Sequence, residues 1–216
     1  MRLLPEEYCN QIIAGDARAL TKRIPDESID LIFCDPVYNQ IDDYRWLAEV
    51  GSRILVDGGN LIAQTGQHYL PQVLAAMDGQ LDYVWVIAKH IWGRNAQMFS
   101  KRIIVAWKPF VWFSKGKRNG DWIFDWIRSG NMDKTVHKWG DPPEMIVGLV
   151  ERLTDEQGVV FDPFTGGGTV PVVCKRLGRN YVAFDIDEET AQVAQRRVEN
   201  TQMPLPLSVP IQKVLV

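Results

Sequence analysis

The chain has 216 residues, 46% of them hydrophobic and 24% charged, with a formal net charge of −3. These values are typical of a globular protein with one core and argue against a disordered or fibrous chain. Arg2 and Pro5 come too early for a secretory signal, and no apolar stretch is long enough to span a bilayer, so we expect a cytoplasmic protein. Three cysteines without a Cys-x-x-Cys pair, and only three histidines, argue against a disulfide framework and a zinc site.

The first part of the chain alternates between strand-like and helix-like patterns. Apolar runs rich in Val and Ile predict strands, and apolar residues spaced at helical intervals predict helices. In chain order we expect a strand at 11–14, a short helix at 17–24, a strand at 28–34, a helix at 42–55, a turn at 57–59, a strand at 60–65 and a helix at 67–77.

The rest of the chain continues this alternation after an irregular middle. We expect strands at 81–88 and 103–113, antiparallel and enclosing a loop near 94–101, and then an irregular insertion at 115–139. Pro142 and Pro143 open a helix that reaches about residue 153. A strand at 159–162, a helix at 170–177, a strand at 181–184, a helix at 188–200 and an extended tail at 201–216 follow. Strands that alternate with helices predict an α/β fold with a mostly parallel sheet.

Two of the predicted strands end in loops with the composition of functional sites. The strand at 28–34 runs into Asp35-Pro36-Val37-Tyr38, and the strand at 159–162 runs into a loop with three consecutive glycines, Asp162-Pro163-Phe164-Thr165-Gly166-Gly167-Gly168-Thr169. Ligands of open α/β sheets bind outside the carboxyl ends of the strands. We therefore expect a substrate at the first loop and a cofactor at the second.

The glycine loop has the features of a site for an adenosine-containing cofactor. Glycines let a ligand approach the backbone, and the helix that follows presents unpaired N–H groups. Asp185 ends the next strand about twenty residues further on, where an acid accepts hydrogen bonds from ribose hydroxyls. A dinucleotide site of the NAD type is disfavoured because Pro171 stands where its third glycine belongs, and no Gly-Lys-Ser/Thr supports a triphosphate loop. A purely structural glycine turn is the remaining alternative.

A basic stretch interrupts this otherwise acidic chain. Residues 89–118 contain eight Lys and Arg and no Asp or Glu, with six Trp and Phe interleaved. Such a stretch can bind the phosphates of a nucleic acid. It can equally be an exposed basic hairpin whose aromatic residues lie in the core, and the composition leaves both interpretations open.

The two loops resemble motifs of one enzyme family. Asp35-Pro36-Val37-Tyr38 resembles the Asp-Pro-Pro-Tyr motif of amino-group DNA methyltransferases, and residues 162–169 resemble the S-adenosylmethionine loop of the same family. The segment that resembles Asp-Pro-Pro-Tyr precedes the glycine loop in the chain. This order matches the β group of the family, whose chain is circularly permuted. The resemblance implies a Rossmann-like S-adenosylmethionine methyltransferase fold, with one domain at 1–200, a target-recognition insertion at about 89–139 and a tail at 201–216.

The resemblance also implies site residues. Asp16 and Ala17, in a Gly-Asp-Ala motif after the first strand, would contact the adenine of S-adenosylmethionine, and Asp185 its ribose. The methionine portion would be held by residues of the glycine loop with help from the segment before the preceding helix, and Asp35 is counted among the cofactor-binding residues as well. These residues are Asp35, His137, Lys138, Asp162, Pro163, Phe164, Thr165, Gly166, Gly168 and Thr169.

The implied reaction is methylation of the exocyclic N6 of an adenine flipped out of double-stranded DNA. Asp35 and the carbonyl of Pro36 would accept the two amino N–H groups, Tyr38 would stack on the base, and no metal is needed. Asp at position 35 favours adenine over the N4 of cytosine. Val37 replaces the second proline of the motif, so a catalytically weakened DNA-binding relative is an alternative; RNA as substrate and a nicotinamide-dependent oxidoreductase are two others.

The basic stretch would then contact DNA. Lys and Arg side chains are candidates for phosphate contacts, and three others could contact base edges. The candidates are Lys101, Arg102, Lys115, Lys117 and Arg118 for phosphates and Arg94, Asn95 and Gln97 for bases. The short insertion predicts a short recognition site or help from a second subunit, which leaves a homodimer open. Trp107 and Trp112 are expected in the core.

Overall fold

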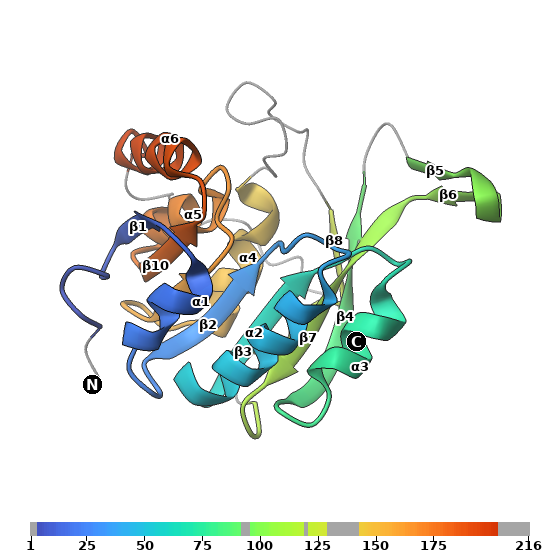
Figure 1. Cartoon of the computed structure of the whole chain (residues 1–216), viewed down its shortest axis with the longest axis horizontal. Helices are drawn as coiled ribbons and strands as arrows, with labels where there is room; N and C mark the ends of the chain where they lie inside the picture. Colours follow the sequence, from blue (N-terminus) through green and yellow to red (C-terminus); the bar gives the residue numbers. More distant parts are fainter. Residues whose placement is uncertain (1–3, 92–95, 119–120, 129–142, 203–216) are drawn as a thin grey trace.

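The computed structural model describes residues 4–91, 96–118, 121–128 and 143–202. Its described strands form an eight-stranded sheet with helices on both faces, and a separate two-stranded hairpin projects from it (Figure 1). The main sheet has the order β1-β10-β9-β2-β3-β7-β4-β8. The predicted α/β fold with a mostly parallel sheet is confirmed.

The strands and helices follow one another much as the sequence predicts. The strands are β1 (Gln11–Ala14), β2 (Ile29–Cys34), β3 (Leu55–Gln64), β4 (Asp82–His90), β5 (Ala96–Met98), β6 (Ile103–Val105), β7 (Trp107–Ser114), β8 (Trp126–Arg128), β9 (Val159–Asp162) and β10 (Asn180–Asp185). The helices are α1 (Ala17–Leu20), α2 (Ile41–Ile54), α3 (Leu70–Met77), α4 (Glu144–Leu153), α5 (Thr169–Leu177) and α6 (Glu188–Glu199), with 3₁₀ turns at Thr21–Arg23 and Phe99–Lys101.

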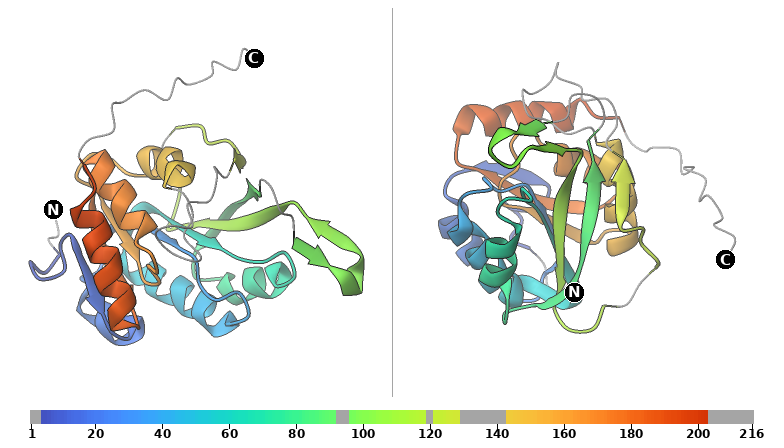
Figure 2. Two further views of the ribbon diagram at one scale, coloured as in Figure 1. Left: turned by 90° about the horizontal axis from the view of Figure 1, so that it is seen from above. Right: turned by 90° about the vertical axis from the view of Figure 1, so that its right-hand side faces the viewer.

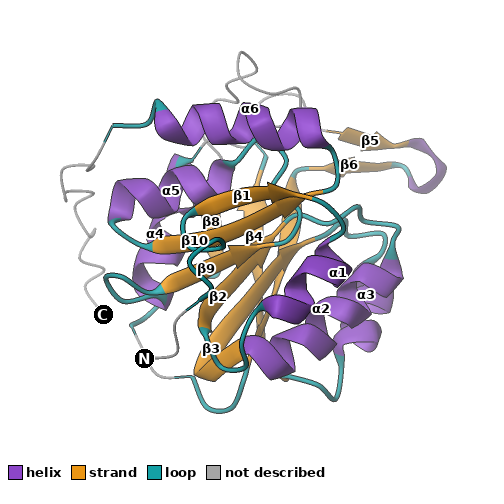
Figure 3. Ribbon diagram, turned by 60° about the vertical axis from the view of Figure 1, so that its left-hand side comes forward, coloured by secondary structure: helices purple, strands orange, loops and turns teal. Residues whose placement is uncertain are grey.

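The sheet is the middle layer of three. In β2, Ile32 packs on one face with residues of α2 and α3, while Leu31 and Phe33 pack on the other face with residues of α4 and α5. Successive side chains of a strand point to opposite faces, so a strand covered on both sides must be apolar throughout. Figure 3 shows α1, α2 and α3 on one side of the sheet and α4, α5 and α6 on the other.

The end of the chain is inserted into the sheet next to its beginning. β10 pairs in parallel with both β1 and β9, and β9 pairs in parallel with β2. The register joins Ala14 to Asp185, Ala183 to Asp162, and Ile32 to Phe161. The carboxyl ends of these four parallel strands therefore lie along one edge of the sheet. This is the arrangement that the circular permutation implied.

Three segments differ from the sequence prediction. One is the insertion expected to be irregular at 115–139, in which β8 forms a strand that pairs in parallel with β4. The turn expected at 57–59 lies within β3 as an irregularity, because the register moves from Ile29–Leu55 to Leu31–Asn60. The N–H of Gly58 donates to the carbonyl of Lys115 at 2.7 Å, so the neighbouring chain ties this segment to the sheet.

The strand expected at 103–113 is two strands. β6 pairs with β5 in the separate hairpin, whereas β7 pairs with β3 and β4. Between them, the carbonyl of Ala106 accepts from Ile91 N at 2.8 Å. The predicted antiparallel pairing of 81–88 with this segment is confirmed for β4 and β7.

None of the helices in the described part of the chain combines the length and the apolar character that a membrane crossing requires. Most of the predicted extended tail, from residue 203 onward, and residues 119–120 and 129–139 of the insertion predicted at 115–139 lie outside the description.

Candidate active site

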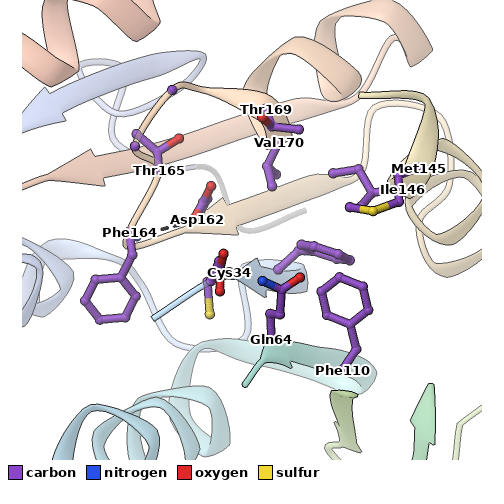
Figure 4. Close-up of a pocket in the computed structure, with 14 residues that line it drawn as sticks. Cys34, Gln64, Phe110, Met145, Ile146, Asp162, Phe164, Thr165, Thr169 and Val170 are labelled. Carbon is purple, nitrogen blue, oxygen red and sulfur yellow. Dashed lines mark hydrogen bonds between the residues drawn. The ribbon is translucent and has the colours of Figure 1, made fainter. Parts of the chain in front are cut away.

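A cavity of about 170 Å³ lies at the sheet edge where β2 and β9 end side by side. Figure 4 shows Asp162, Cys34 and Gln64 around its middle, with Met145 and Ile146 reaching in from α4. Both sequence motifs contribute to its wall. The lining residues are Phe33, Cys34, Asp35, Gln64, Phe110, Met145, Ile146, Asp162, Phe164, Thr165, Gly166, Gly167, Thr169 and Val170.

Asp162 is a buried carboxyl group in this wall. Its Oδ1 accepts a hydrogen bond from the N–H of Phe164 at 3.2 Å. Burial raises the pKa of Asp162 to about 8, and the negative charges of Asp185 and Asp35 act in the same direction. The carboxyl group therefore favours its protonated form at neutral pH, and in that form it can donate as well as accept a hydrogen bond.

The glycine loop needs glycine at two positions. Gly166 and Gly168 have φ values of +48° and +74°, in the left-handed region. A Cβ on Gly168 would lie 2.9 Å from the Cβ of Ala194, so α6 packs directly against the loop. The loop passes into α5, whose first N–H groups face the same edge of the sheet as the cavity.

Asp185 secures the glycine loop from the neighbouring strand. One of its carboxylate oxygens accepts from Gly166 N at 2.9 Å, and the other accepts from Asp187 N at 3.0 Å. Its carbonyl accepts from Gly15 N at 2.8 Å, which places the Gly-Asp-Ala motif beside it. Asp16 is exposed and caps α1 by accepting from Arg18 N, and Ala17 is buried. These residues lie at the same edge but do not line the cavity.

The other loop keeps its aromatic residue in a fixed position. The hydroxyl of Tyr38 accepts hydrogen bonds from Gln64 Nε2 at 2.6 Å and from Lys108 Nζ at 2.8 Å. The Lys108 ammonium also lies 5.0 Å from the centre of the Tyr38 ring. Asp35 is exposed at the mouth of the cavity and Pro36 is buried. The side chain of Val37 is 65% exposed.

Gln64 and Lys89 are site residues that the sequence did not single out. Lys89 is 4% exposed and donates from Nζ to Gln64 Oε1 at 2.6 Å. Gln64 thus connects the buried ammonium group to Tyr38. Their one signal in the sequence is Gln64, a polar residue at the carboxyl end of an apolar strand.

The predicted DNA contacts separate into two groups. Gln97, Lys101 and Arg102 are exposed on the β5–β6 hairpin. Lys115, Lys117 and Arg118 follow the end of β7, at the opposite edge of the sheet from the cavity. There Lys115 donates to the carbonyl of Leu55 at 3.0 Å, and the Arg118 guanidinium lies 4.8 Å from the Trp112 ring. The structure does not bring these last three together with the cavity.

The remaining predicted residues lie elsewhere. Arg94, Asn95, His137 and Lys138 lie outside the described residues. Of the two tryptophans expected in the core, Trp112 is buried and Trp107 is partly exposed. No cluster of three or more His, Cys, Asp or Glu that could hold a metal occurs within the described part of the chain.

Comparisons with known sequences point to one kind of protein. A family model described as DNA methylase matches residues 121–196. The chain is 24% identical to the type II methyltransferase M.BglII of Bacillus subtilis, over 88% of this chain and 69% of that protein. It is also 24% identical to M.HinfI of Haemophilus influenzae, over 89% of this chain and 69% of that protein.

Comparisons with solved structures agree on the fold. The M1.HpyAVI–SAM complex superposes with a TM-score of 0.74 at 19% identity, covering 87% of this chain and 98% of that one. The cytosine-N4-specific PvuII DNA methyltransferase superposes with a TM-score of 0.76 at 16% identity, covering 89% and 93%. The fold of this chain is therefore that of these proteins.

Proposed function

We propose, from the premise that this chain is a relative of the N6/N4 DNA methyltransferases, that it transfers a methyl group from S-adenosylmethionine to an exocyclic amino group in DNA. The family model and the curated relatives confirm the resemblance that the two motifs predicted. One observation carries the proposal to function: the two motif loops, 127 residues apart at Asp35 and Asp162, line one cavity.

The glycine-loop side of the cavity suits the cofactor. The backbone of Gly166 and Gly167 is open to a ligand, and Asp185 fixes the loop. We assign the methionine portion of S-adenosylmethionine to this loop and the adenosine to the adjoining edge that carries Asp16 and Asp185. Bound there, the cofactor supplies an electrophilic methyl group. Asp162 can change its protonation state to suit the positive sulfonium.

The Asp35 side suits the amino group of a flipped base. This group is a poor nucleophile because its lone pair is delocalised into the ring. Asp35 accepts one N–H and the Pro36 carbonyl accepts the other, which favours a tetrahedral nitrogen that can attack the methyl carbon. As the nitrogen–carbon bond forms, the bond from that carbon to sulfur would break to leave a neutral thioether, and the amino group would lose one proton. Tyr38 stacks on the base, and its ring is already held by Gln64 and Lys108. Positioning then accounts for much of the rate enhancement.

We favour adenine N6 as the acceptor because position 35 is Asp, and we expect an active enzyme despite Val37. The valine side chain is 65% exposed and does not line the cavity, so we expect Asp35 and Tyr38 to keep their places. Cytosine N4 is the second candidate, since the PvuII enzyme with a similar fold is cytosine-N4-specific.

The test is a nucleoside digest of genomic DNA that lacks methylated bases, after incubation with the protein and labelled S-adenosylmethionine. We expect label in N6-methyladenine, and loss of that label in Asp35→Ala. Asp78→Ala, an exposed acid at the far edge of the sheet, is the matched control and should keep full activity. Label in N4-methylcytosine would overturn the adenine assignment, and an unchanged Asp35→Ala would overturn the mechanism.

A further inference from the structure

We propose that the β5–β6 hairpin is a DNA-binding arm and that Phe99 at its tip enters the duplex beside the base to be methylated. This inference rests on the proposed function and adds to it the element that opens the duplex. It concerns residues 96–105, which we call the arm.

The arm rises from the same edge of the sheet as the cavity. It connects β4 to β7, and the start of β7 pairs with the end of β3, where Gln64 lies opposite Phe110. The next link is a hydrogen bond from Thr65 N to the carbonyl of Pro109 at 2.9 Å. Both Gln64 and Phe110 line the cavity. Figure 1 and Figure 2 show β5 and β6 extending beyond the body of the molecule from this edge.

The arm exposes large apolar side chains. Phe99 is 83% exposed, Ile104 is 64% exposed and Ile103 is 52% exposed. Removing apolar side chains of this size from water stabilises a complex, so the arm gains when a partner covers it. A two-stranded hairpin that keeps such residues away from the core is typical of an interaction element.

The charge of the arm identifies the partner. Lys101 and Arg102 follow Phe99 within three residues at the tip, and both are exposed. The arm contains no Asp or Glu, and neither does the rest of residues 89–118. Cations beside an apolar side chain match the two parts of a nucleic acid, phosphates outside and base faces inside. A second copy of this chain, with a net charge of −3, complements these cations less well than the phosphates of DNA do.

The tip holds its aromatic residue at the outer end. Phe99 begins the 3₁₀ turn Phe99–Lys101, and Arg102 N donates to the carbonyl of Phe99 at 3.2 Å. Arg102 has a φ of +54°, an unfavourable conformation for a residue with a side chain. The chain therefore reverses within three residues after Phe99, at the cost of a strained backbone at Arg102.

A wedge of this kind fits the chemistry of the site. The amino group reaches Asp35 only if the base leaves the stack, which costs the free energy of its stacking and pairing. An apolar side chain that occupies the gap offsets part of this cost, as in proteins that insert Phe, Leu or Ile between base steps. Loss of Phe99 should then matter for a paired target and not for one that is already unpaired.

The experiment compares two duplexes. Sequencing of plasmid DNA methylated by the wild type identifies the target, and one duplex carries it paired while the other carries it opposite an abasic site. We expect Phe99→Ala to slow methylation of the paired duplex by about tenfold or more and to change the abasic duplex by less than about twofold. Phe99→Leu should stay near the wild type. Tyr83→Ala, an exposed aromatic at the far end of β4, should leave both rates unchanged.

Three results would overturn the inference. Equal slowing on both duplexes would make Phe99 a general contact, and unchanged rates would make it irrelevant. The third result is self-association of the protein in the absence of DNA. If it depended on concentration and Phe99→Ala abolished it, the tip would bind a second copy of the chain.

Failure of the proposed function has a different signature, since the wild type would then methylate no DNA. In that case the salt dependence of binding to plasmid duplex tests the arm by itself. Lys101→Gln combined with Arg102→Asn should reduce the slope of log K against log salt by about 2, because two phosphate contacts are lost. Asn is chosen at position 102 because it tolerates the left-handed conformation. An unchanged slope would exclude the arm from the DNA interface.

Discussion

Tyr38 is held through its hydroxyl group, by hydrogen bonds from Gln64 and Lys108, and not through its ring alone. Tyr38→Phe keeps the stacking surface but leaves both donors without this acceptor. Hydrogen bonds that involve a charged group contribute about 1.5–3 kcal/mol, so we expect methyl transfer to DNA to slow by about tenfold. Single-turnover kinetics with saturating cofactor would measure this.

The affinity for S-adenosylmethionine separates this effect from damage to the fold. It should stay unchanged in Tyr38→Phe, because Tyr38 is not among the residues that line the cavity. Tyr38→Ala, which also removes the stacking surface, should be slower than Tyr38→Phe. If Tyr38→Phe matched the wild type, the hydroxyl network would have no part in positioning the base.

Asp162 makes stability depend on pH. Its pKa is raised to about 8 in the folded protein, above its value of about 3.8 in the unfolded chain. Between these values the folded state binds more protons, so the stability of the wild type falls as the pH rises from 4 to 8. Asp162→Asn removes this fall, and we expect a gain on the order of a few kcal/mol at pH 8.5 that is absent at pH 4. Urea unfolding across this range would measure it; parallel curves for the two proteins would contradict it.

The sequence predicted the individual site residues unevenly. Apolar runs end at Asp35 and Asp162, and the glycines follow a few residues after the second run. A short apolar run predicts a buried strand from one sequence alone, so the end of the strand can be predicted as well. The contact between Lys89 and Gln64 could not be predicted, because it depends on the register of β4 and β3 on either side of β7. Register across a sheet is a tertiary property, and no local pattern around Lys89 distinguishes it from the other cations of residues 89–118.

The glycine loop and α6 form one packed element, and this leads to a matched pair of substitutions. Gly166→Ala adds a Cβ with nothing within 4 Å, so its cost is the left-handed backbone, about 1–2 kcal/mol. Gly168→Ala has the same backbone cost and a contact of 2.9 Å with the Cβ of Ala194. We expect its free energy of unfolding to fall by about 1–3 kcal/mol more. Chemical denaturation would decide, and equal losses would mean that α6 moves aside freely.

Elements were well predicted where their ends carry a chemical signal. Pro143 before α4, Asp187 at the N-cap of α6 and Gly178 after α5 mark the ends of those helices. The division between β6 and β7 has no such mark, because apolar and β-branched residues continue through Ala106. What separates them is the hydrogen bond that Ile91 N donates to the carbonyl of Ala106 and the pairing of β6 with β5. Both are made by chain outside the segment, so propensity within it could not predict the break.

At the scale of the whole molecule, the order of the sheet came from the resemblance and not from local patterns. The patterns predict parallel strands alternating with helices, which fits many strand orders. Only the order of the two motifs indicated that β9 and β10 lie between β1 and β2. The cavity depends on this order, since it is formed where the first and last thirds of the chain meet.

Asp30 joins these two parts of the chain. Its Oδ2 accepts from Val159 N at 2.7 Å, where the first residue of β9 meets β2. Asp30→Ala leaves this N–H without its acceptor, so we expect the free energy of unfolding to fall by about 1–3 kcal/mol. For a chain of this size each kcal/mol lowers Tm by about 2–4 °C. Calorimetry would measure the shift.

Asp30→Asn is the control that separates the hydrogen bond from the charge. Burial raises the pKa of Asp30, so its ionised form is disfavoured in the folded protein, and an amide oxygen can accept from Val159 without that cost. Asp30→Asn should therefore lie closer to the wild type than Asp30→Ala. Both variants should unfold in a single transition by circular dichroism and by fluorescence, because β9 and β10 are enclosed by strands from the start of the chain. Separate transitions would show that the last third of the chain holds its structure independently of β1 and β2.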